Sequence, residues 1–431
     1  MQRIGIIGTG YVGLVTAAVF ADLGNKVICQ DSDNQKIKQL RQGIVPIYEP
    51  GLKALVKKNL KAKRLSFTHI LPEVVSKSLI IFICVGTPPR EDGSADLSSV
   101  ENVVRRIAQN MKEYKIIVSK STVPVETGER IQQTIRRYNK RKIGFSIVSN
   151  PEFLREGQAL KDTLHPDRII LGVEDKKAEQ IMRQLFKPIK APIVITNIKT
   201  AEIIKHASNS FLANKISFIN AVAQICEKVG ADVVKVAQGM GLDKRIGQAF
   251  LDAGCGFGGF CFPKDLEAFI YIAKKSGYDF ALLREVAKIN QEQKHRLLKK
   301  IEESVWIIRD KTIGVLGLSF KPNTDDIRFS VSLDVIRMLQ NEGARIKAYD
   351  PQSMPKVKRL LKNISFCQNP YQVAKNSDCL VIMTEWEEFR QLDLRRIKRL
   401  LRQPIIVDGR NIFQPKQMSE LGFIYKSIGR V

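Results

Sequence analysis

Short apolar runs alternate with helix-like stretches along the first part of the chain. Runs of about four to eight apolar residues that end in turn-forming residues are typical of buried strands in a parallel sheet. The first two runs, 3–8 and 26–31, enclose a helix-like stretch at 14–24. Further runs occur at 79–85, 115–119 and 145–149. This alternation predicts a doubly wound α/β domain.

The pattern changes from about residue 199, where apolar residues recur at three- and four-residue intervals over 200–230. A second helical stretch at 279–304 predicts a connecting helix. Strand-like runs then return at 312–320, 344–351, 377–386 and 404–413, with a helix around 330–342. The sequence therefore predicts an α/β protein with two Rossmann-like doubly wound domains, joined by a central helical domain with a long connecting helix. The expected domains are 1–198, 199–305 and 306–431.

The stretch GTGYVG follows the first predicted strand and opens the first predicted helix. Gly8, Gly10 and Gly13 match the dinucleotide fingerprint, which needs a tight turn, close approach to a pyrophosphate, and close packing of helix on strand. Asp31 ends the next predicted strand, where a carboxylate would bond ribose hydroxyls and disfavour a 2′-phosphate. The pattern predicts an NAD site rather than an NADP site. A glycine turn without a ligand is the alternative.

Polar residues follow several other predicted strands. Thr87, Thr122, Glu152 and Glu156 stand in such positions. Because ligands of doubly wound sheets bind at the carboxyl ends of the strands, these residues together outline one site. Taken singly, each could equally be an ordinary turn residue.

Two polar residues share one face of the long helix predicted at 200–230. Lys205 and Asn209 are four residues apart, so their side chains lie on the same side of the helix. An amine and an amide side by side could hydrogen-bond one developing oxyanion. A polar stripe that faces solvent is the alternative, since these residue types are usually exposed.

The C-terminal predicted domain begins with GVLGLSFK, which keeps Gly314 and Gly317 but has no third glycine. A ligand other than a second dinucleotide is therefore expected there. Lys321, Arg328 and Arg410 lie in or near predicted strand-end loops, where they could hold phosphates. Unpaired surface positions are the alternative for these side chains.

The glycine-rich stretch GFGGFCFPKD holds one cysteine, Cys261, outside any clear helix or strand pattern. The neighbouring glycines allow close approach to a ligand, and Lys264 and Asp265 follow with charge and hydrogen-bonding groups. A buried, inert thiol is the usual case. Beside an NAD site, a thiolate could instead add to an aldehyde, surrender a second hydride as a hemithioacetal, and release an acid to water. A four-electron oxidation is therefore one hypothesis.

The composition adds an excess of positive charge, with 70 Lys and Arg against 44 Asp and Glu and a net charge of +26. The basic clusters at 57–64, 136–142 and 394–402 are separate and lack interleaved aromatics, which favours solvated helix faces over a nucleic-acid surface.

Seven irregularly spaced cysteines indicate reduced thiols, and no metal site is expected. With no signal-like start and no apolar run near the roughly 20 residues that span a bilayer, we expect a cytoplasmic protein without membrane insertion.

A series of motifs runs in order along the chain: GTGYVG, VGTP, STVP, NPEFLREG, HPDRI, KHASNSFLANKISF, RIGQAFLDAGCGFGGFCFPKD, SFKPNTDDIR and DGRNIF. In this series the chain resembles the UDP-glucose/GDP-mannose dehydrogenase family over essentially its full length. The resemblance implies an NAD-binding domain, a helical centre that forms a homodimer, and a C-terminal domain that holds uridine nucleotide. It also implies oxidation of UDP-glucose to UDP-glucuronate with two NAD, because FGGFCFPKD and NPEFLREG are most similar to that branch. GDP-mannose and UDP-N-acetyl sugars are the alternative substrates.

The resemblance further implies roles at matching positions. Cys261 would be the nucleophile, with Lys205 and Asn209 stabilising the oxyanion. Asp265 and Thr122 would assist proton transfer through water, and Glu152 would help thioester hydrolysis. The residues expected around NAD are Gly8, Gly10, Val12, Gly13, Asp31, Lys36, Thr87, Thr122, Glu156, Lys264 and Arg328. The residues expected around the substrate are Glu152, Phe153, Leu154, Glu156, Lys205, Asn209, Phe257, Gly258, Phe320, Lys321, Arg410 and, reaching across from the neighbouring subunit, Arg245.

Two positions depart from the family's pattern. Phe260 stands just before the nucleophile, where the family usually has serine, and Cys255 adds a thiol to the same loop. We expect effects on rate and redox sensitivity more than on reaction type. Outside the family, a two-electron hydroxy-acid dehydrogenase is disfavoured by the Cys261 loop and the second nucleotide-type domain. A noncatalytic nucleic-acid-binding protein is the third hypothesis, which salt-sensitive binding would support.

Overall fold

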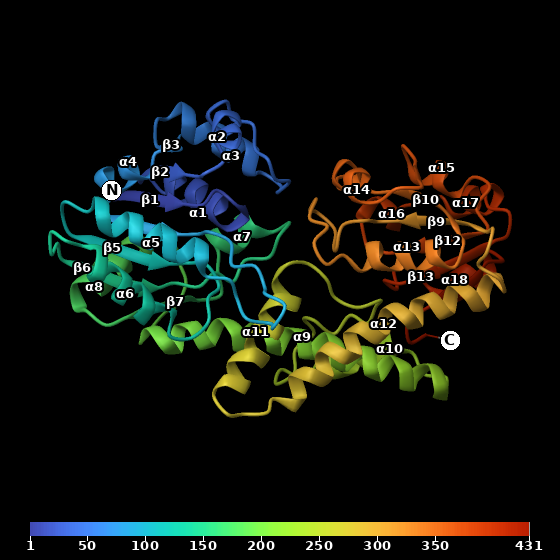
Figure 1. Ribbon diagram of the computed structural model, residues 1–431. Helices are drawn as coiled ribbons and strands as arrows, with labels where there is room; N and C mark the ends of the chain where they lie inside the picture. The colour runs from blue at the N-terminus through green and yellow to red at the C-terminus, as the bar shows by residue number, and fades with distance from the viewer. Residues whose placement is uncertain (431) are drawn as a thin grey trace. The chain divides into compact units, whose positions relative to one another are not determined.

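The structure is a computed structural model that describes residues 1–430 (Figure 1). The chain divides into two compact units: one holds residues 1–208 and 267–278, and the other holds 209–266 and the chain from Asp279 onward. Two of the boundaries fall inside helices, α9 (Ile198–Val229) and α11 (Cys261–Lys275), and the third falls in the loop after α11. Each unit contains one sheet, so the predicted pair of doubly wound sheets is confirmed.

The first unit contains an eight-stranded sheet in the order β3-β2-β1-β4-β5-β6-β7-β8, which is parallel except between β6 and β7. Its first six strands have the order of a dinucleotide-binding domain, 3-2-1-4-5-6. The strands are β1 Arg3–Ile7, β2 Lys26–Gln30, β3 Leu65–Thr68, β4 Ile80–Ile83, β5 Lys115–Ser119, β6 Phe145–Ser149, β7 Ile169–Val173 and β8 Ile193–Thr196. The helices are α1 Tyr11–Asp22, α2 Asn34–Arg41, α3 Leu52–Lys61, α4 Leu71–Lys77, α5 Ser98–Asn110, α6 Thr127–Tyr138, α7 Ala159–Leu164 and α8 Lys176–Phe186.

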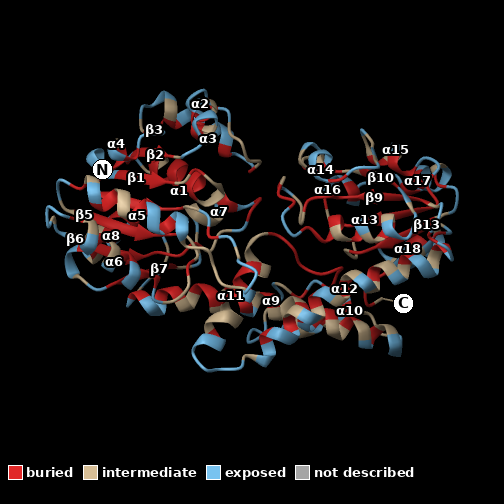
Figure 2. Ribbon diagram, in the orientation of Figure 1, coloured by how far each residue is buried: buried red, intermediate tan, exposed pale blue. Residues whose placement is uncertain are grey.

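Alternate residues of these strands supply two separate cores. Ile80 and Phe82 of β4 pack into one cluster, and Ile81 and Ile83 pack into the other. Because both faces of the sheet are covered, its central strands are apolar throughout, which is why they appear as continuous runs in the sequence. Figure 2 shows these strands as buried and the outer sides of many helices as exposed.

The second unit contains a six-stranded parallel sheet in the order β11-β10-β9-β12-β13-β14. Its strands are β9 Thr312–Leu316, β10 Arg345–Tyr349, β11 Ile364–Phe366, β12 Cys379–Ile382, β13 Ile405–Asp408 and β14 Ile424–Ser427. Its short helices are α13 Val331–Asn341, α14 Met354–Leu360, α15 Pro370–Ala374, α16 Glu387–Arg390, α17 Leu394–Leu400 and α18 Pro415–Glu420. Helix α10 Val233–Gly241 and the long helix α12 Ala281–Val305 also belong to this unit.

The long helices confirm the sequence prediction closely, since α9 and α12 correspond to the predicted stretches 200–230 and 279–304. One prediction is wrong: Cys261 does not lie outside the regular elements but is the first residue of α11. The helix was hard to recognise because Pro263 follows, although proline is tolerated in a first turn, where backbone N–H groups have no partner within the helix. Among residues 1–430 no helix is both long and apolar enough to cross a membrane.

Candidate active site

The dinucleotide fingerprint forms the turn between β1 and α1. Gly8 has a φ of +96°, and a Cβ there would lie 2.6 Å from the carbonyl oxygen of Cys84. A Cβ on Gly13 would lie 1.9 Å from the carbonyl oxygen of Gly8, so any side chain would push the helix off the strand. A Cβ on Gly10 would meet no atom within 4 Å, so the backbone there is open to a pyrophosphate. The turn therefore fits the dinucleotide that its sequence predicts.

Asp31 follows β2 beside this turn. Its Oδ2 accepts hydrogen bonds from the backbone N–H (2.9 Å) and the hydroxyl (2.7 Å) of Thr9, and from Lys36 Nζ (3.0 Å). Burial acts to raise the pKa of Asp31, but the hydrogen bonds from Thr9 and Lys36 outweigh it and leave the pKa below its ordinary value. The carboxylate is therefore charged and fixed in place. Sequence reasoning missed Thr9, although its place inside the fingerprint was a visible signal.

Thr87 and Thr122, predicted at two separate strand ends, are in contact. The Thr87 hydroxyl donates a hydrogen bond to the backbone carbonyl of Thr122 at 2.8 Å. Their strands, β4 and β5, are parallel neighbours, so their carboxyl ends lie at one edge of the sheet. The expectation that these loops converge is thereby met.

The start of α9 holds the segment that carries Thr122. Glu202 accepts hydrogen bonds from the backbone N–H groups of Glu126 (2.9 Å) and Gly128 (2.8 Å). Nε2 of His206 lies 2.9 Å from the carbonyl oxygen of Val123. Both side chains are buried, and sequence reasoning missed them because their partners lie more than 70 residues earlier in the chain.

Lys205 and Glu152 form a buried ion pair. Lys205 Nζ donates to Oε1 of Glu152 at 2.9 Å, and the two side chains are only 4% and 7% exposed. The second carboxylate oxygen, Oε2, accepts the backbone N–H of Leu154 at 2.8 Å. The Lys205 ammonium also lies 5.2 Å from the ring centre of Phe153. The solvent-facing alternative for Lys205 is therefore excluded.

Asn209 is also buried and donates a hydrogen bond to Oδ2 of Asp265 at 2.6 Å. Asp265 is almost fully buried and forms an ion pair with Lys264. Cys261 stands four residues before Asp265 at the start of α11 and is partly exposed. Residues four apart share a helix face, and a helix N-terminus favours negative charge. The arrangement suits a thiolate followed by a carboxylate that is already hydrogen-bonded to an amide.

The glycine-rich loop before Cys261 lies against the segment 320–329. The Gly259 N–H donates to the carbonyl oxygen of Arg328 at 3.1 Å. A Cβ on Gly258 would lie 2.2 Å from the carbonyl oxygen of Phe329, so only glycine fits there. The Arg328 guanidinium lies 4.3 Å from the ring centre of Phe260, the residue that departs from the family's serine. The structure thus brings this loop and the predicted 320–328 residues together.

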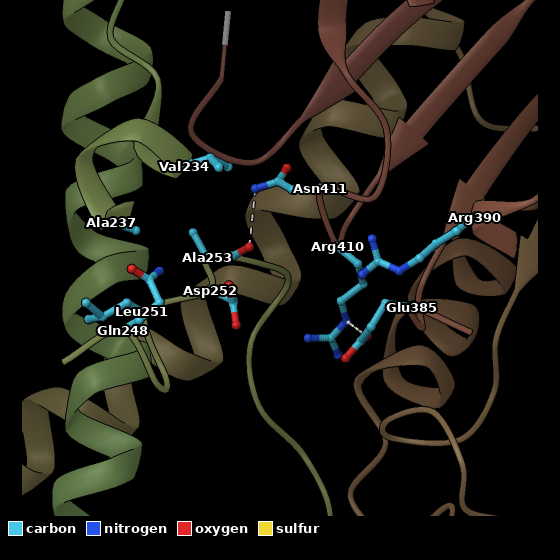
Figure 3. A pocket seen from close by; sticks show the side chains of 10 residues that line it. All are labelled: Val234, Ala237, Gln248, Leu251, Asp252, Ala253, Glu385, Arg390, Arg410 and Asn411. Carbon is cyan, nitrogen blue, oxygen red and sulfur yellow. Dashed lines mark hydrogen bonds and ion pairs between the residues drawn. The ribbon is translucent and has the colours of Figure 1, made fainter. Parts of the chain in front are cut away.

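Arg410 follows β13 and reaches the same loop. Its Nε donates to the carbonyl oxygen of Met383 (2.9 Å), and its Nη1 donates to that of Gly256 (3.2 Å). Arg410 also borders a cavity of about 270 Å³, in which Figure 3 shows Arg410 beside Glu385. The other residues that line this cavity are Val234, Ala237, Gln248, Leu251, Asp252, Ala253, Arg390 and Asn411. Arg410 is therefore engaged with the glycine-rich loop, which excludes the unpaired-surface alternative for it.

Two other predicted positions have contrasting surroundings. The Arg245 side chain is 89% exposed and pairs with Asp243. Cys255 is fully buried, and burial raises the pKa of its thiol, so it differs from the partly exposed Cys261. Within the described chain, no group of three or more His, Cys, Asp or Glu residues is placed to hold a metal ion.

Three sequence profiles match consecutive parts of the chain. They describe the NAD binding domain (residues 2–190), the central domain (199–292) and the UDP binding domain (314–415) of one family. The chain belongs to the UDP-glucose/GDP-mannose dehydrogenase family. It is accordingly an oxidoreductase that uses NAD, and the open turn at Gly10 and the fixed Asp31 carboxylate fit that cofactor.

Relatives within the family are similar over their whole length. UDP-glucose 6-dehydrogenase TuaD of Bacillus subtilis (strain 168) is 48% identical, with 100% of this chain and 94% of the relative covered. UDP-glucose 6-dehydrogenase of Rhizobium meliloti (strain 1021) is 46% identical, with both chains fully covered. The solved UDP-glucose dehydrogenase of Pyrobaculum islandicum has a TM-score of 0.94 at 37% identity and covers 100% of this chain and 98% of its own.

Proposed function

We propose that this protein oxidises UDP-glucose at C6 to UDP-glucuronate, with two NAD per substrate, through a covalent intermediate on Cys261. The observation that carries the proposal is the arrangement at the start of α11. There a partly exposed thiol precedes a buried Asp265 by one turn, and Asp265 holds the Asn209 amide at 2.6 Å. The substrate follows from the two relatives named UDP-glucose 6-dehydrogenase that are nearly half identical to this chain.

The proposed reaction removes two hydrides from one carbon. The alcohol first loses a proton and a hydride to give an aldehyde, to which the Cys261 thiolate adds. Lys205 and Asn209 stabilise the oxyanion of this thiohemiacetal, because each is buried and carries a hydrogen-bond donor. Loss of the second hydride gives a thioester, and water then displaces the thiolate to release the acid. Glu152 assists that hydrolysis, and Thr122 and Asp265 relay protons through water.

The remaining predicted residues bind and orient the two ligands. Bound NAD supplies the hydride acceptor. We assign its ribose to Asp31 and Lys36, its pyrophosphate to the turn at Gly8, Gly10, Val12 and Gly13, and its other contacts to Thr87, Thr122, Glu156, Lys264 and Arg328. We assign the sugar nucleotide to Glu152, Phe153, Leu154, Glu156, Lys205, Asn209, Phe257, Gly258, Phe320, Lys321 and Arg410.

The stoichiometry of the reaction tests this proposal. When the reaction of the purified protein is taken to completion, two NADH should form for each UDP-glucose consumed. Cys261→Ala should form no UDP-glucuronate and at most one NADH per UDP-glucose, because the second oxidation needs the thiohemiacetal. The control Cys367→Ala, which removes another partly exposed thiol, should keep the ratio of two. A ratio of one would mean that oxidation stops at the aldehyde. A higher specificity constant for GDP-mannose or a UDP-N-acetyl sugar would assign a different substrate.

We also propose that the protein is a homodimer in which Arg245 reaches the substrate of the neighbouring subunit. Phe211, Phe218 and Ile225 are spaced seven residues apart on α9 and are 63%, 49% and 60% exposed. Residues at this spacing form one stripe along a helix. A stripe of large apolar side chains in contact with water is unfavourable, so a second copy of the same helix is a suitable cover. The high exposure of Arg245 leaves it available to such a partner.

Complementation between two inactive variants tests the shared site. Arg245→Ala and Cys261→Ala should each fail to form UDP-glucuronate alone. If Arg245 acts across the interface, mixed dimers contain one complete site, and about a quarter of the wild-type activity should return after random exchange. Light scattering and mass measurement would show whether mixed dimers have formed. If they have formed and activity does not return, Arg245 acts at its own subunit's site or outside any site.

Two broader predictions complete the proposal. We infer domain limits of 1–198, 199–305 and 306–431, which limited proteolysis would test by the positions of the first cuts. We also infer a cytoplasmic location, which cell fractionation would test.

A further inference from the structure

Three distant segments of the first unit meet at the buried carboxylate of Glu49. The Tyr11 hydroxyl donates a hydrogen bond to Oε2 of Glu49. The Gly157 N–H donates to the same oxygen at 2.7 Å and to the Tyr11 oxygen at 2.9 Å, and the Ala159 N–H donates to Oε1 at 2.7 Å. Both carboxylate oxygens are therefore occupied by donors from segments more than 35 and more than 100 residues away.

Two of these segments belong to the proposed site. Tyr11 is the first residue of α1 and directly follows Gly10 of the dinucleotide turn. Gly157 ends the stretch PEFLREG, to which the sugar nucleotide is assigned, and its φ of +80° turns the chain into α7. Glu49 precedes α3, and α1 packs against both α3 and α7. The Glu49 carboxylate thus fastens the dinucleotide helix to the end of the substrate segment.

Hydrogen bonds compensate the burial of the Glu49 carboxylate. A buried carboxylate is strongly unfavourable unless charged hydrogen bonds compensate for lost hydration, and Glu49 is only 6% exposed. Burial, the hydrogen bond to Glu49 and the charges of Glu49 and Glu156 all raise the pKa of Tyr11, so its hydroxyl keeps the proton that it donates.

We propose that Tyr11 and Glu49 are positioning residues that couple the dinucleotide helix to residues 151–157 and thereby set the affinity of that segment for the sugar nucleotide. The inference rests on the proposed function, because that function assigns the segment to UDP-glucose. Neither side chain takes part in the chemical steps. Both act through the backbone of Gly157, and Glu49 acts also through that of Ala159.

Binding of UDP-glucose in the absence of NAD tests the inference. Tyr11→Phe and Glu49→Gln should each raise the dissociation constant for UDP-glucose by about tenfold, the effect of losing one charged hydrogen bond. The double variant should be no weaker than the weaker single variant, because the two residues act as a unit. Tyr114→Phe is the matched control, since it removes a tyrosine hydroxyl that bonds Ser146 in the same unit, and it should leave the constant within twofold.

Three measurements distinguish a positioning role of Tyr11 and Glu49 from an effect on stability alone. A lower melting temperature with UDP-glucose affinity unchanged in both variants would overturn the proposal, because a purely structural role alters only the folded fraction. A change in NADH affinity alone would also overturn it. Deuterium exchange provides a readout that does not need UDP-glucose: NADH should slow exchange at 151–159 in the wild type but not in Tyr11→Phe. If the wild type fails to bind or oxidise UDP-glucose, the proposed substrate fails, and this exchange difference still decides whether the coupling exists.

Discussion

The ammonium of Lys205 lies 2.9 Å from the carboxylate of Glu152, and both side chains are almost completely buried. A pair of this kind contributes little net stability when intact, because burial removes the hydration of both charges. Removal of one partner is different, since it leaves the other charge buried and uncompensated. The proposed reaction gives this buried pair a role that its small net contribution to stability does not. Substitutions can separate the effect of the pair on activity from its effect on stability.

Single and double substitutions should separate these effects. Glu152→Leu and Lys205→Met should each lower the free energy of unfolding by about 3 kcal/mol, whereas the double variant should recover most of that loss. All three should lack activity. Urea unfolding at pH 7 measures the stabilities. A double variant that stays as unstable as either single variant would show that the pair stabilises the fold, and a loss equal to the sum of the singles would show that the two residues are not coupled.

Cysteine reactivity should follow burial. Burial raises the pKa of each of the five buried thiols, Cys29, Cys84, Cys226, Cys255 and Cys379. Iodoacetamide at pH 7.5 should therefore modify Cys261 first and abolish activity, since Cys261 is partly exposed at a helix N-terminus. Peptide mass mapping at increasing times gives the order. Modification of Cys255 as early as Cys261 would contradict the buried position of the second thiol.

Binding of NAD should depend on Thr9 as well as on Asp31. Thr9→Val removes the hydroxyl that holds Oδ2 of Asp31 at 2.7 Å but keeps the backbone N–H bond, so the KM for NAD should rise by about three- to tenfold. Asp31→Ser should have a larger effect on the KM for NAD and should reduce the preference for NAD over NADP.

The pKa of Asp31 is lowered in the folded protein. Its stabilising charge is therefore present above pH 3.8, the ordinary pKa of the group, and is lost only at more acid pH. NAD affinity should consequently show no Asp31 titration between pH 5 and 8.

Features that depend on local spacing could be predicted from the sequence. Side-chain contacts between distant residues could not. The three fingerprint glycines have roles set within one turn, and the four-residue spacing of Lys205 and Asn209 placed both on one face of α9. Their partners could not be read in the same way, because Glu152 and Asp265 lie 53 and 56 residues away. The solvent-facing alternative for this stripe rested on the usual exposure of these residue types, and the burial of both side chains excludes it.

Weak elements were missed for a related reason. Strand β14, with the sequence IYKS, lies at the edge of its sheet and is largely exposed or half-buried, so it lacks the continuous apolar run that revealed the central strands. Polar residues that act through backbone groups, such as Glu49 and Glu202, carry no motif of their own. Only the folded chain shows which N–H groups they meet.

Glu202 should give the protein a measurable pH dependence. Burial raises its pKa from 4.5 to about 7, even though it accepts hydrogen bonds from the N–H groups of Glu126 and Gly128. Because the folded pKa lies above the unfolded one, its stabilising contribution is complete below pH 4.5 and is lost as the pH rises through 7. The total change is at most about 3 kcal/mol.

Glu202→Gln removes this titration and should flatten the dependence of the melting temperature on pH between 5 and 8. Glu179→Gln, which alters a carboxylate in an exposed ion pair on α8, is a suitable control and should keep the wild-type slope. Since Glu202 holds the segment that carries Thr122, the wild-type protein should also show faster deuterium exchange at 121–128 at pH 8 than at pH 6, after correction for intrinsic exchange rates. An identical pH slope in wild type and Glu202→Gln would show that the carboxylate stays charged throughout, held by its two backbone hydrogen bonds.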